Sequence, residues 1–231
     1  MESDWHRKQI NLLIESLGWY WRGRSNWYAG GNMFIYFSRE EARNRDFRGP
    51  DFFAVQGVDG TRMRDWWAIW DEGGRYPDTI IELLSPTTRR LDLGVKKDVY
   101  EEIFRTPEYV CYDPDGEMLL GWRLSPEVPS RYATLIPDAS GRIELRTLGL
   151  WLGTWRGPYQ GFEKTWLRFF DAQGRLVPTA EEVREDEKRR AEEEKHRADV
   201  EKQRADVERQ RADALVAEVA RLKAQLEQQQ K

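Results

Sequence analysis

The stretch TIIELL, residues 79–84, places a single carboxylate, that of Glu82, inside an apolar run. Such an unbroken run is typical of a strand that is buried on both faces. A carboxylate in that environment costs free energy unless it is paired or binds a metal ion. A second carboxylate at Asp51 and an amine at Lys96, on the helix-like segment that follows, would offset this cost by binding a divalent cation. This order of residues indicates a metal-dependent phosphodiesterase site.

Composition limits the protein to a few classes. The 231-residue chain has 39% hydrophobic residues, enough for one packed domain plus an appendage. The single cysteine, Cys111, permits no internal disulfide, no apolar run approaches the ~20 residues of a membrane span, and the charged N-terminus does not resemble a signal peptide. These features predict a cytoplasmic protein without a membrane partner. The net charge of -4 argues against non-specific coating of nucleic acid, so any DNA contact is expected to be local.

The composition changes at Thr179. From there to the C-terminus the chain has no Gly or Pro, and the phrase Arg-Ala-Asp-Val, or a close variant, repeats every seven residues. We therefore expect two parts, residues 1–178 as the folded domain and residues 179–231 as one long charged helix. A heptad seam between Ala212 and Leu226 would join two copies as a coiled-coil homodimer. Because alanine seams bury little area, a solvated single helix is an equal alternative.

Periodicity and turn residues give a coarse map of the domain. Apolar residues at helical spacing predict a first helix around Ile10 to Leu17, and the spacing between Leu93 and Ile103 predicts a second. Strands are predicted over residues 26–28, 33–37, 52–55, 79–84, 108–112, 119–124, 133–136 and 148–152. The first two strands flank Gly30-Gly31, which predicts a hairpin or a tight turn. This mixture predicts an α/β or mixed α+β body.

Four segments carry a resemblance to a known family. They are GPDFFAV at residues 49–55, YPDTIIELLSPTT at 76–88, DLGVKKDVY at 92–100 and PEY at 107–109. These segments resemble the Uma-type family of restriction endonucleases, within the PD-(D/E)xK nuclease superfamily. The phrase TLGL at 147–150 and the stretch from Leu167 to Glu181, which ends in the charged helix, are similar as well, so the resemblance spans nearly the whole chain. It implies a restriction-endonuclease-like core, in which helices flank a mixed β-sheet, followed by one long C-terminal helix.

The resemblance assigns site residues position by position. Asp51 matches the motif aspartate, and Glu82 matches the acidic residue on the following core strand. In the simplest superfamily pattern the lysine lies two residues after that acid, but this position is Leu84. The family implies that the next helix supplies the lysine, which maps to Lys96, with Lys97 as the alternative. Neighbouring helix positions differ by about 100 degrees, so only one of these two lysines can face the carboxylates well.

The residue types then indicate the chemistry. The carboxylates of Asp51 and Glu82 and the backbone carbonyl of Leu83 offer the hard oxygen ligands that Mg²⁺ or Mn²⁺ prefers. Lys96 would orient the attacking water and stabilise the charge that develops on the phosphate. We therefore expect a metal-dependent DNA endonuclease that hydrolyses phosphodiester bonds, with DNA as its partner.

Other interpretations of the same residues stay open. Glu82 could form an ordinary buried ion pair with Arg89 or Arg90 instead of binding a metal ion. His6 and His196 are expected to face solvent, because one is in the terminal helix and the other in the charged tail. The chain could also be an inactive nuclease fold that binds nucleic acid or protein and assembles through its C-terminal helix, since a fold does not guarantee an activity.

Overall fold

The computed structural model of the protein describes residues 3–38, 49–127 and 131–229, with side chains described as far as residue 223. The chain divides into two compact units, Met1–Ala180 and Glu181–Lys231. The first unit is a body of sheets and short helices, and the second consists of one long helix. The mixed α+β class and the long C-terminal helix that the sequence predicts are thereby confirmed.

A six-stranded sheet forms the centre of the body. Its strands are β1 (Trp27–Gly30), β3 (Phe52–Gln56), β5 (Thr79–Leu83), β6 (Glu108–Asp113), β7 (Met118–Leu124) and β8 (Tyr132–Leu135). They lie in the order β1-β3-β5-β6-β7-β8. β5 and β6 are parallel, and the other neighbouring pairs are antiparallel. A parallel pair requires a crossover connection, and helical segments between residues 89 and 102 make it.

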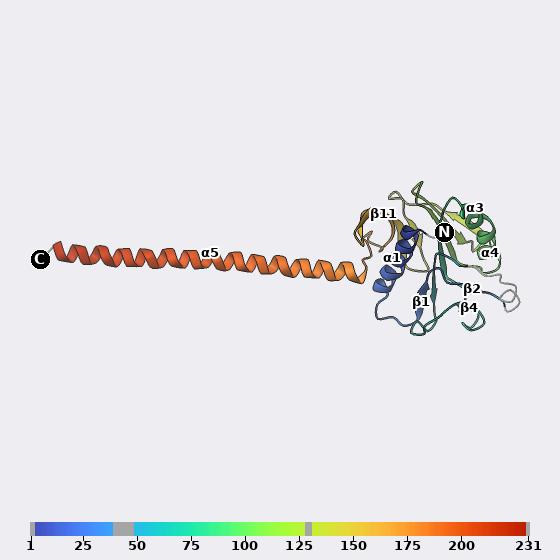
Figure 1. The fold of residues 1–231 in the computed structure, drawn as a ribbon, viewed down its shortest axis with the longest axis horizontal. Helices are drawn as coiled ribbons and strands as arrows, with labels where there is room; N and C mark the ends of the chain where they lie inside the picture. Colours follow the sequence, from blue (N-terminus) through green and yellow to red (C-terminus); the bar gives the residue numbers. More distant parts are fainter. Residues whose placement is uncertain (1–2, 39–48, 128–130, 230–231) are drawn as a thin grey trace. The chain divides into compact units, whose positions relative to one another are not determined.

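One face of the central sheet is covered by the helix α1 (Asp4–Tyr20) and by a second sheet. The second sheet consists of three antiparallel strands, β9 (Ile143–Leu145), β10 (Leu150–Tyr159) and β11 (Phe162–Phe170). α1 lies beside β11 in this layer (Figure 1). Leu13 of α1, Phe52 of β3 and Leu167 of β11 belong to one buried apolar cluster. Because burial of apolar surface drives folding, this cluster fixes α1 against the sheet.

The opposite face of the central sheet packs against the π-helical turn η1 (Asp92–Lys96) and α4 (Lys97–Glu102), which follow the short helix α3 (Arg89–Leu91). Ile80 of β5 and Tyr100 of α4 belong to a second buried cluster on this face. Side chains alternate between the faces along a strand, and Ile81 accordingly belongs to the first cluster. Glu82 therefore points to the same face as Ile80, toward the helical crossover.

The helical crossover differs from the sequence prediction. The spacing between Leu93 and Ile103 predicts one regular helix, whereas the structure has a kink at Gly94, within η1. Gly94 has φ -115° and ψ -105°, which are not helical values. A residue without a Cβ atom adopts such a conformation readily, and π-turns of this kind are frequent at functional sites. The kink lies between Asp92 and Lys96, two residues of the candidate site described below.

Two strand predictions need correction. The turn at Gly30-Gly31 does not join a hairpin, because β1 pairs with β3, while β2 (Ile35–Tyr36) pairs in parallel with β4 (Trp67–Ala68). The strand predicted over residues 148–152 is only the beginning of β10, which continues to Tyr159 and forms a long hairpin with β11. The β1–β3 pairing joins strands that are not consecutive, so the sequence periodicity did not reveal it. The β10–β11 pairing is local, but the strand prediction did not include the turn at Gln160-Gly161 that joins the two strands.

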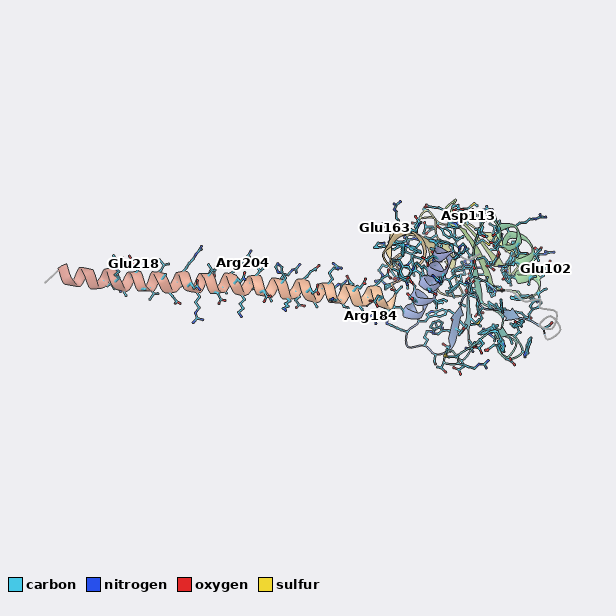
Figure 2. All side chains as sticks on the ribbon, viewed as in Figure 1. Glu102, Asp113, Glu163, Arg184, Arg204 and Glu218 are labelled. Carbon is cyan, nitrogen blue, oxygen red and sulfur yellow. The ribbon has the colours of Figure 1, made fainter. Side chains whose placement is uncertain are left out.

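The C-terminal helix α5 spans Ala180–Gln229 and has 50 residues. Its side chains from residue 201 to residue 223 are all exposed, and Arg204 and Glu218 project from the helix among them (Figure 2). Its charges pair along the helix, as in the ion pair between Lys188 and Glu192. Among all the residues that the structure describes, we find no helix with the length and apolar character that a bilayer crossing requires.

Candidate active site

Strand register brings the two predicted carboxylates together. β3 and β5 are antiparallel, and Phe52 lies opposite Ile81. The same register continued by one position sets Asp51 opposite Glu82. Opposite residues of an antiparallel pair project from the same side of the sheet. Both carboxylates therefore lie on the side that the helical crossover covers.

Each of the two carboxylates accepts a hydrogen bond from the backbone of the opposite segment. The backbone N–H of Asp51 donates to Oε2 of Glu82 over 3.3 Å. The backbone N–H of Leu83 donates to Oδ2 of Asp51 over 2.7 Å. Buried carboxylate oxygens need such donors, because burial removes them from water. The bonds fix the orientation of both carboxylates at the point where the β3–β5 ladder ends.

The helical crossover adds an amine, a hydroxyl and a third carboxylate. Nζ of Lys96 lies 3.0 Å from Oε1 of Glu82 and 2.8 Å from Oδ1 of Asp92. The hydroxyl of Tyr100 donates to the same Oε1 of Glu82 over 3.0 Å. The side chains of Glu82 and Asp92 are each 1% exposed, and that of Lys96 is 14% exposed. The site is thus a buried network of three acids around one amine.

The structure also distinguishes between the candidate partners of Glu82. Nζ of Lys97 points to Oε2 of Glu101, 3.5 Å away, and lies over the rings of Trp122 and Tyr132. Of the two candidate lysines, Lys96 is therefore the one that reaches the carboxylates. Arg89, proposed above as an ion-pair partner of Glu82, instead pairs with Asp113.

Burial changes the protonation of this network. It raises the pKa of Glu82 to about 8, the ammonium of Lys96 opposes this rise, and the carboxylates of Asp51 and Asp92 add to it. Burial also raises the pKa of Asp51, against the donated bond from Leu83. Burial alone would lower the pKa of Lys96, but Glu82 and Asp92 outweigh it and hold this pKa above its ordinary value. The site therefore has more buried acids than one lysine can neutralise.

His6 does not face solvent only, contrary to the sequence prediction. Its ring is half-buried, and Nε2 lies 3.2 Å from the carbonyl oxygen of Leu83. A carbonyl oxygen can only accept, so Nε2 carries the proton of this bond. Nδ1 lies 2.9 Å from the hydroxyl of Ser3. The second histidine, His196, is exposed on α5, as predicted.

These groups border a pocket of about 160 Å³. Its walls are formed by His6, Asn32, Asp51, Leu83, Ser85, Thr87, Thr88, Asp92 and Lys96. Sequence reasoning identified three of these residues, Asp51, Leu83 and Lys96, and missed Asp92 and His6 as members of the site. The four-residue spacing from Asp92 to Lys96 was a signal for a shared helix face. No local signal points to His6, because it is 77 residues from Leu83 in sequence.

The donor set fits a hard divalent cation that keeps part of its water shell. The described residues contain no group of three His, Cys, Asp or Glu side chains arranged to enclose a metal ion. Mg²⁺ commonly binds through one or two carboxylates, with water and substrate phosphate completing its shell. Asp51 and the Leu83 carbonyl border the pocket, and Glu82 adjoins them. The excess of buried acids over Lys96 is the feature that a divalent cation would neutralise.

The comparison with protein-family models agrees with the family resemblance. The model of the family Uma2, described as "Putative restriction endonuclease", matches residues 1–154. The match is shorter than the nearly whole chain over which the sequence analysis saw the resemblance, and it does not include the C-terminal helix. A solved structure described as a putative nuclease belonging to DUF820, from Anabaena variabilis ATCC 29413, is 16% identical and has a TM-score of 0.45. That match covers 64% of this chain and 75% of the other. Among curated proteins, none matches the chain.

Proposed function

The chain belongs to the Uma2 family, and from this membership we propose that it is a divalent-metal-dependent DNA endonuclease whose active site contains Asp51, Glu82 and Lys96. One observation carries the proposal. Two carboxylates that are 31 residues apart hydrogen-bond to each other's strands, and the lysine of the crossover meets one of them. A buried cluster of this kind, with perturbed pKa values and beside a pocket, is typical of a catalytic site.

The metal ligands of the proposed site come from two adjacent strands. The carboxylates of Asp51 and Glu82 and the carbonyl of Leu83 would hold one Mg²⁺ or Mn²⁺ ion. When bound, such an ion supplies Lewis-acid chemistry and lowers the pKa of a water molecule. Glu82 has a pKa of about 8, so its proton would have to leave when a cation binds. Metal affinity should therefore increase with pH.

Lys96 would stabilise charge on the phosphate. Its ammonium is held between Glu82 and Asp92, and its side chain borders the pocket. An ammonium that is already oriented needs little reorganisation when negative charge develops on a substrate oxygen. Tyr100 donates to Glu82 and thereby keeps the carboxylate turned toward Lys96. Asp92 and Tyr100 are thus positioning residues in the proposal.

Hydroxyl groups on the other wall of the pocket could receive the substrate. Ser85, Thr87 and Thr88 border the pocket and hydrogen-bond among themselves. Hydroxyls rotate at little cost and can donate to phosphate oxygens. This wall would hold the phosphate without adding a positive charge beside Lys96.

A cleavage assay tests the proposed function. Supercoiled plasmid is incubated with the protein and Mg²⁺ or Mn²⁺, and a parallel sample contains EDTA. The expected result is conversion to nicked or linear DNA with metal and no conversion with EDTA. Without the cation, the carboxylates of the site would repel the negative charge that develops on the phosphate. A protein that cuts equally well in EDTA, or that cuts neither plasmid nor short DNA with either ion, would contradict the proposal.

A second function, self-association through α5, is favoured by a specific observation. Leu215, Val219 and Leu222 are between 50% and 67% exposed, although they follow one another at steps of four and three residues. Such a seam is typical of a coiled coil. We propose that it joins two copies of the chain, and light scattering of the full-length protein should give twice the chain mass. The side chain of Leu226, the predicted last seam position, lies outside the described residues.

A further inference from the structure

A second pocket adjoins the candidate active site. It has a volume of about 390 Å³, and His6 and Ser85 border both pockets. Its remaining walls include Trp5 of α1, Pro86 of the loop after β5 and Pro114 of the turn after β6. The two pockets therefore lie next to each other, and we name the second pocket the Trp5 groove.

We propose that the Trp5 groove holds an unpaired nucleobase next to the phosphate that is cleaved, so that the substrate is single-stranded or locally unpaired DNA. This inference rests on the proposed nuclease function, which places a phosphate beside Lys96. The volume of the groove is in the range of ligand-binding pockets and is larger than that of the pocket that borders Lys96. A base paired inside a duplex could not enter it.

The walls of the groove have the chemistry of a base-binding site. Trp5 is half-buried and borders the groove, while Pro86 is exposed and Pro114 is half-buried. Aromatic side chains such as that of Trp5 stack on bases without selecting a sequence. The ring of Trp5 is held in place because it lies parallel to that of Trp166, with the ring centroids 6.5 Å apart. A fixed ring loses little conformational freedom when a base stacks on it.

The charges around the groove do not suit a duplex. Lys164 is on its wall, but Asp115 and Glu117 are there too, and all three side chains are exposed. Binding of double-stranded DNA relies on many phosphate contacts from Lys and Arg. Lys96, the cation that borders the first pocket, is already engaged by two carboxylates. A single strand that binds by base stacking needs fewer contacts between its phosphates and positively charged side chains.

The test measures binding with the full-length protein. A fluorescein-labelled oligothymidylate and a labelled duplex of the same length are titrated in Ca²⁺, a hard divalent ion, and anisotropy is recorded. The single strand is expected to bind at least about tenfold more tightly than the duplex, since one stacked base contributes about that factor. Equal or tighter binding of the duplex would overturn the inference.

Three variants connect this preference to the groove. Trp5→Leu should weaken single-strand binding about tenfold, because the stacking surface is lost. Lys164→Glu should weaken it and Glu117→Lys should strengthen it, each several-fold, through charge alone. Lys202→Glu, an equally exposed lysine on α5, is the matched control and should have no effect.

The outcomes separate this inference from the proposed nuclease function. Trp5→Leu removes a ring that contacts Trp166, so its fold must be checked; Lys164→Glu changes an exposed side chain and keeps the inference testable. Unchanged single-strand affinity in both Lys164→Glu and Glu117→Lys would contradict the proposal that the Trp5 groove binds a nucleobase. If the parent protein nevertheless cleaves plasmid in a metal-dependent manner, the proposed nuclease function would still stand. Selective binding that follows the three variants, without any cleavage, would support the groove and contradict the nuclease.

Discussion

The body and α5 contain the same kinds of charged side chains in opposite environments. Lys96 and Asp92, in the body, form an ion pair four residues apart, with side chains 14% and 1% exposed. Lys188 and Glu192, on α5, form an ion pair at the same spacing, with side chains 79% and 70% exposed. The sequence spacing is identical, and the surroundings differ. Burial, rather than the presence of paired charges, therefore distinguishes the candidate site.

The physical basis of the difference is the surrounding dielectric. An exposed ion pair contributes little to stability, because water screens it and two long side chains must be ordered. A buried charge is far more costly when its partner is removed, since nothing replaces the lost water. The same contrast explains why the pKa of Glu82 moves to about 8 in the body. Changes in the body should therefore have larger effects than matched changes on α5.

The largest expected effect is on DNA cleavage. Glu82→Gln keeps the shape of the side chain and removes a metal-binding oxygen, so the rate of plasmid cleavage should fall by at least about a hundredfold. Asp199→Asn makes the corresponding acid-to-amide change at an exposed position of α5 and should cut at the parent rate. Circular dichroism checks that both variants are folded. Glu82→Gln cutting as fast as Asp199→Asn would remove Glu82 from the site.

The next effect is on stability. Lys96→Met removes the amine from among Glu82, Asp92 and Asp51, and the free energy of unfolding at neutral pH should fall by about 3 kcal/mol. Lys188→Met on α5 should change it by less than about 0.5 kcal/mol. Urea unfolding followed by tryptophan fluorescence measures both. Similar losses in the two variants would mean that burial does not distinguish the two ion pairs.

A more gradual effect, spread over several pH units, is expected from pH. The pKa of Glu82 rises from 4.5 to about 8 in the folded protein. Between these pH values the folded state keeps a proton that the unfolded state releases, so stability should fall as pH rises, by at most about 1.4 kcal/mol per pH unit from this group. The raised pKa of Asp51 acts in the same direction. The raised pKa of Lys96 acts only at higher pH.

Urea unfolding at several pH values without divalent ions measures this slope. Glu82→Gln removes the titrating group and should flatten it, whereas Asp199→Asn should leave it unchanged. Mg²⁺ should also reduce the slope in the parent, because the cation competes with the proton. A stability that increases through this range would contradict the raised pKa of Glu82.

The smallest effect on the body is expected from changes in α5. Leu215→Glu combined with Leu222→Glu places charges in the proposed seam, and light scattering should show a change from dimer to monomer. The free energy of unfolding of the body should stay within about 0.5 kcal/mol. Ala217→Glu, outside the seam, is the control and should leave the dimer intact. A parent protein that is monomeric at high concentration would contradict the coiled coil.

The sequence predicted the parts of the site that follow from local patterns. The apolar runs at residues 52–55 and 79–84 predicted two strands, with Asp51 directly before the first and Glu82 within the second. Strand register brings these two residues together. The family resemblance mapped the site lysine to Lys96, with Lys97 as the alternative, and helical spacing allowed only one of the two to face the carboxylates. The geometry places Lys96 beside Glu82 and Lys97 beside Glu101. These residues were accessible to sequence reasoning because strand and helix periods fix the direction of a side chain.

Other parts depended on packing between distant segments. Asp92 enters the site beside the kink at Gly94, and apolar spacing gave no sign of that kink. His6 reaches Leu83 only because α1 packs on the central sheet. The charge pattern of α5 predicted its helix, but charges alone do not determine whether the seam has a partner.

The most direct test of the account is metal binding measured without DNA. Mn²⁺ is titrated into the full-length protein, and the Tm is recorded for the parent, Asp51→Ala and the α5 control Asp199→Ala. An ion that binds the folded state stabilises it, by about 2.7 kcal/mol at a hundred times its Kd. The account predicts a rising Tm for the parent and for Asp199→Ala and a constant Tm for Asp51→Ala. An equal rise in all three proteins, or a rise in none, would contradict it.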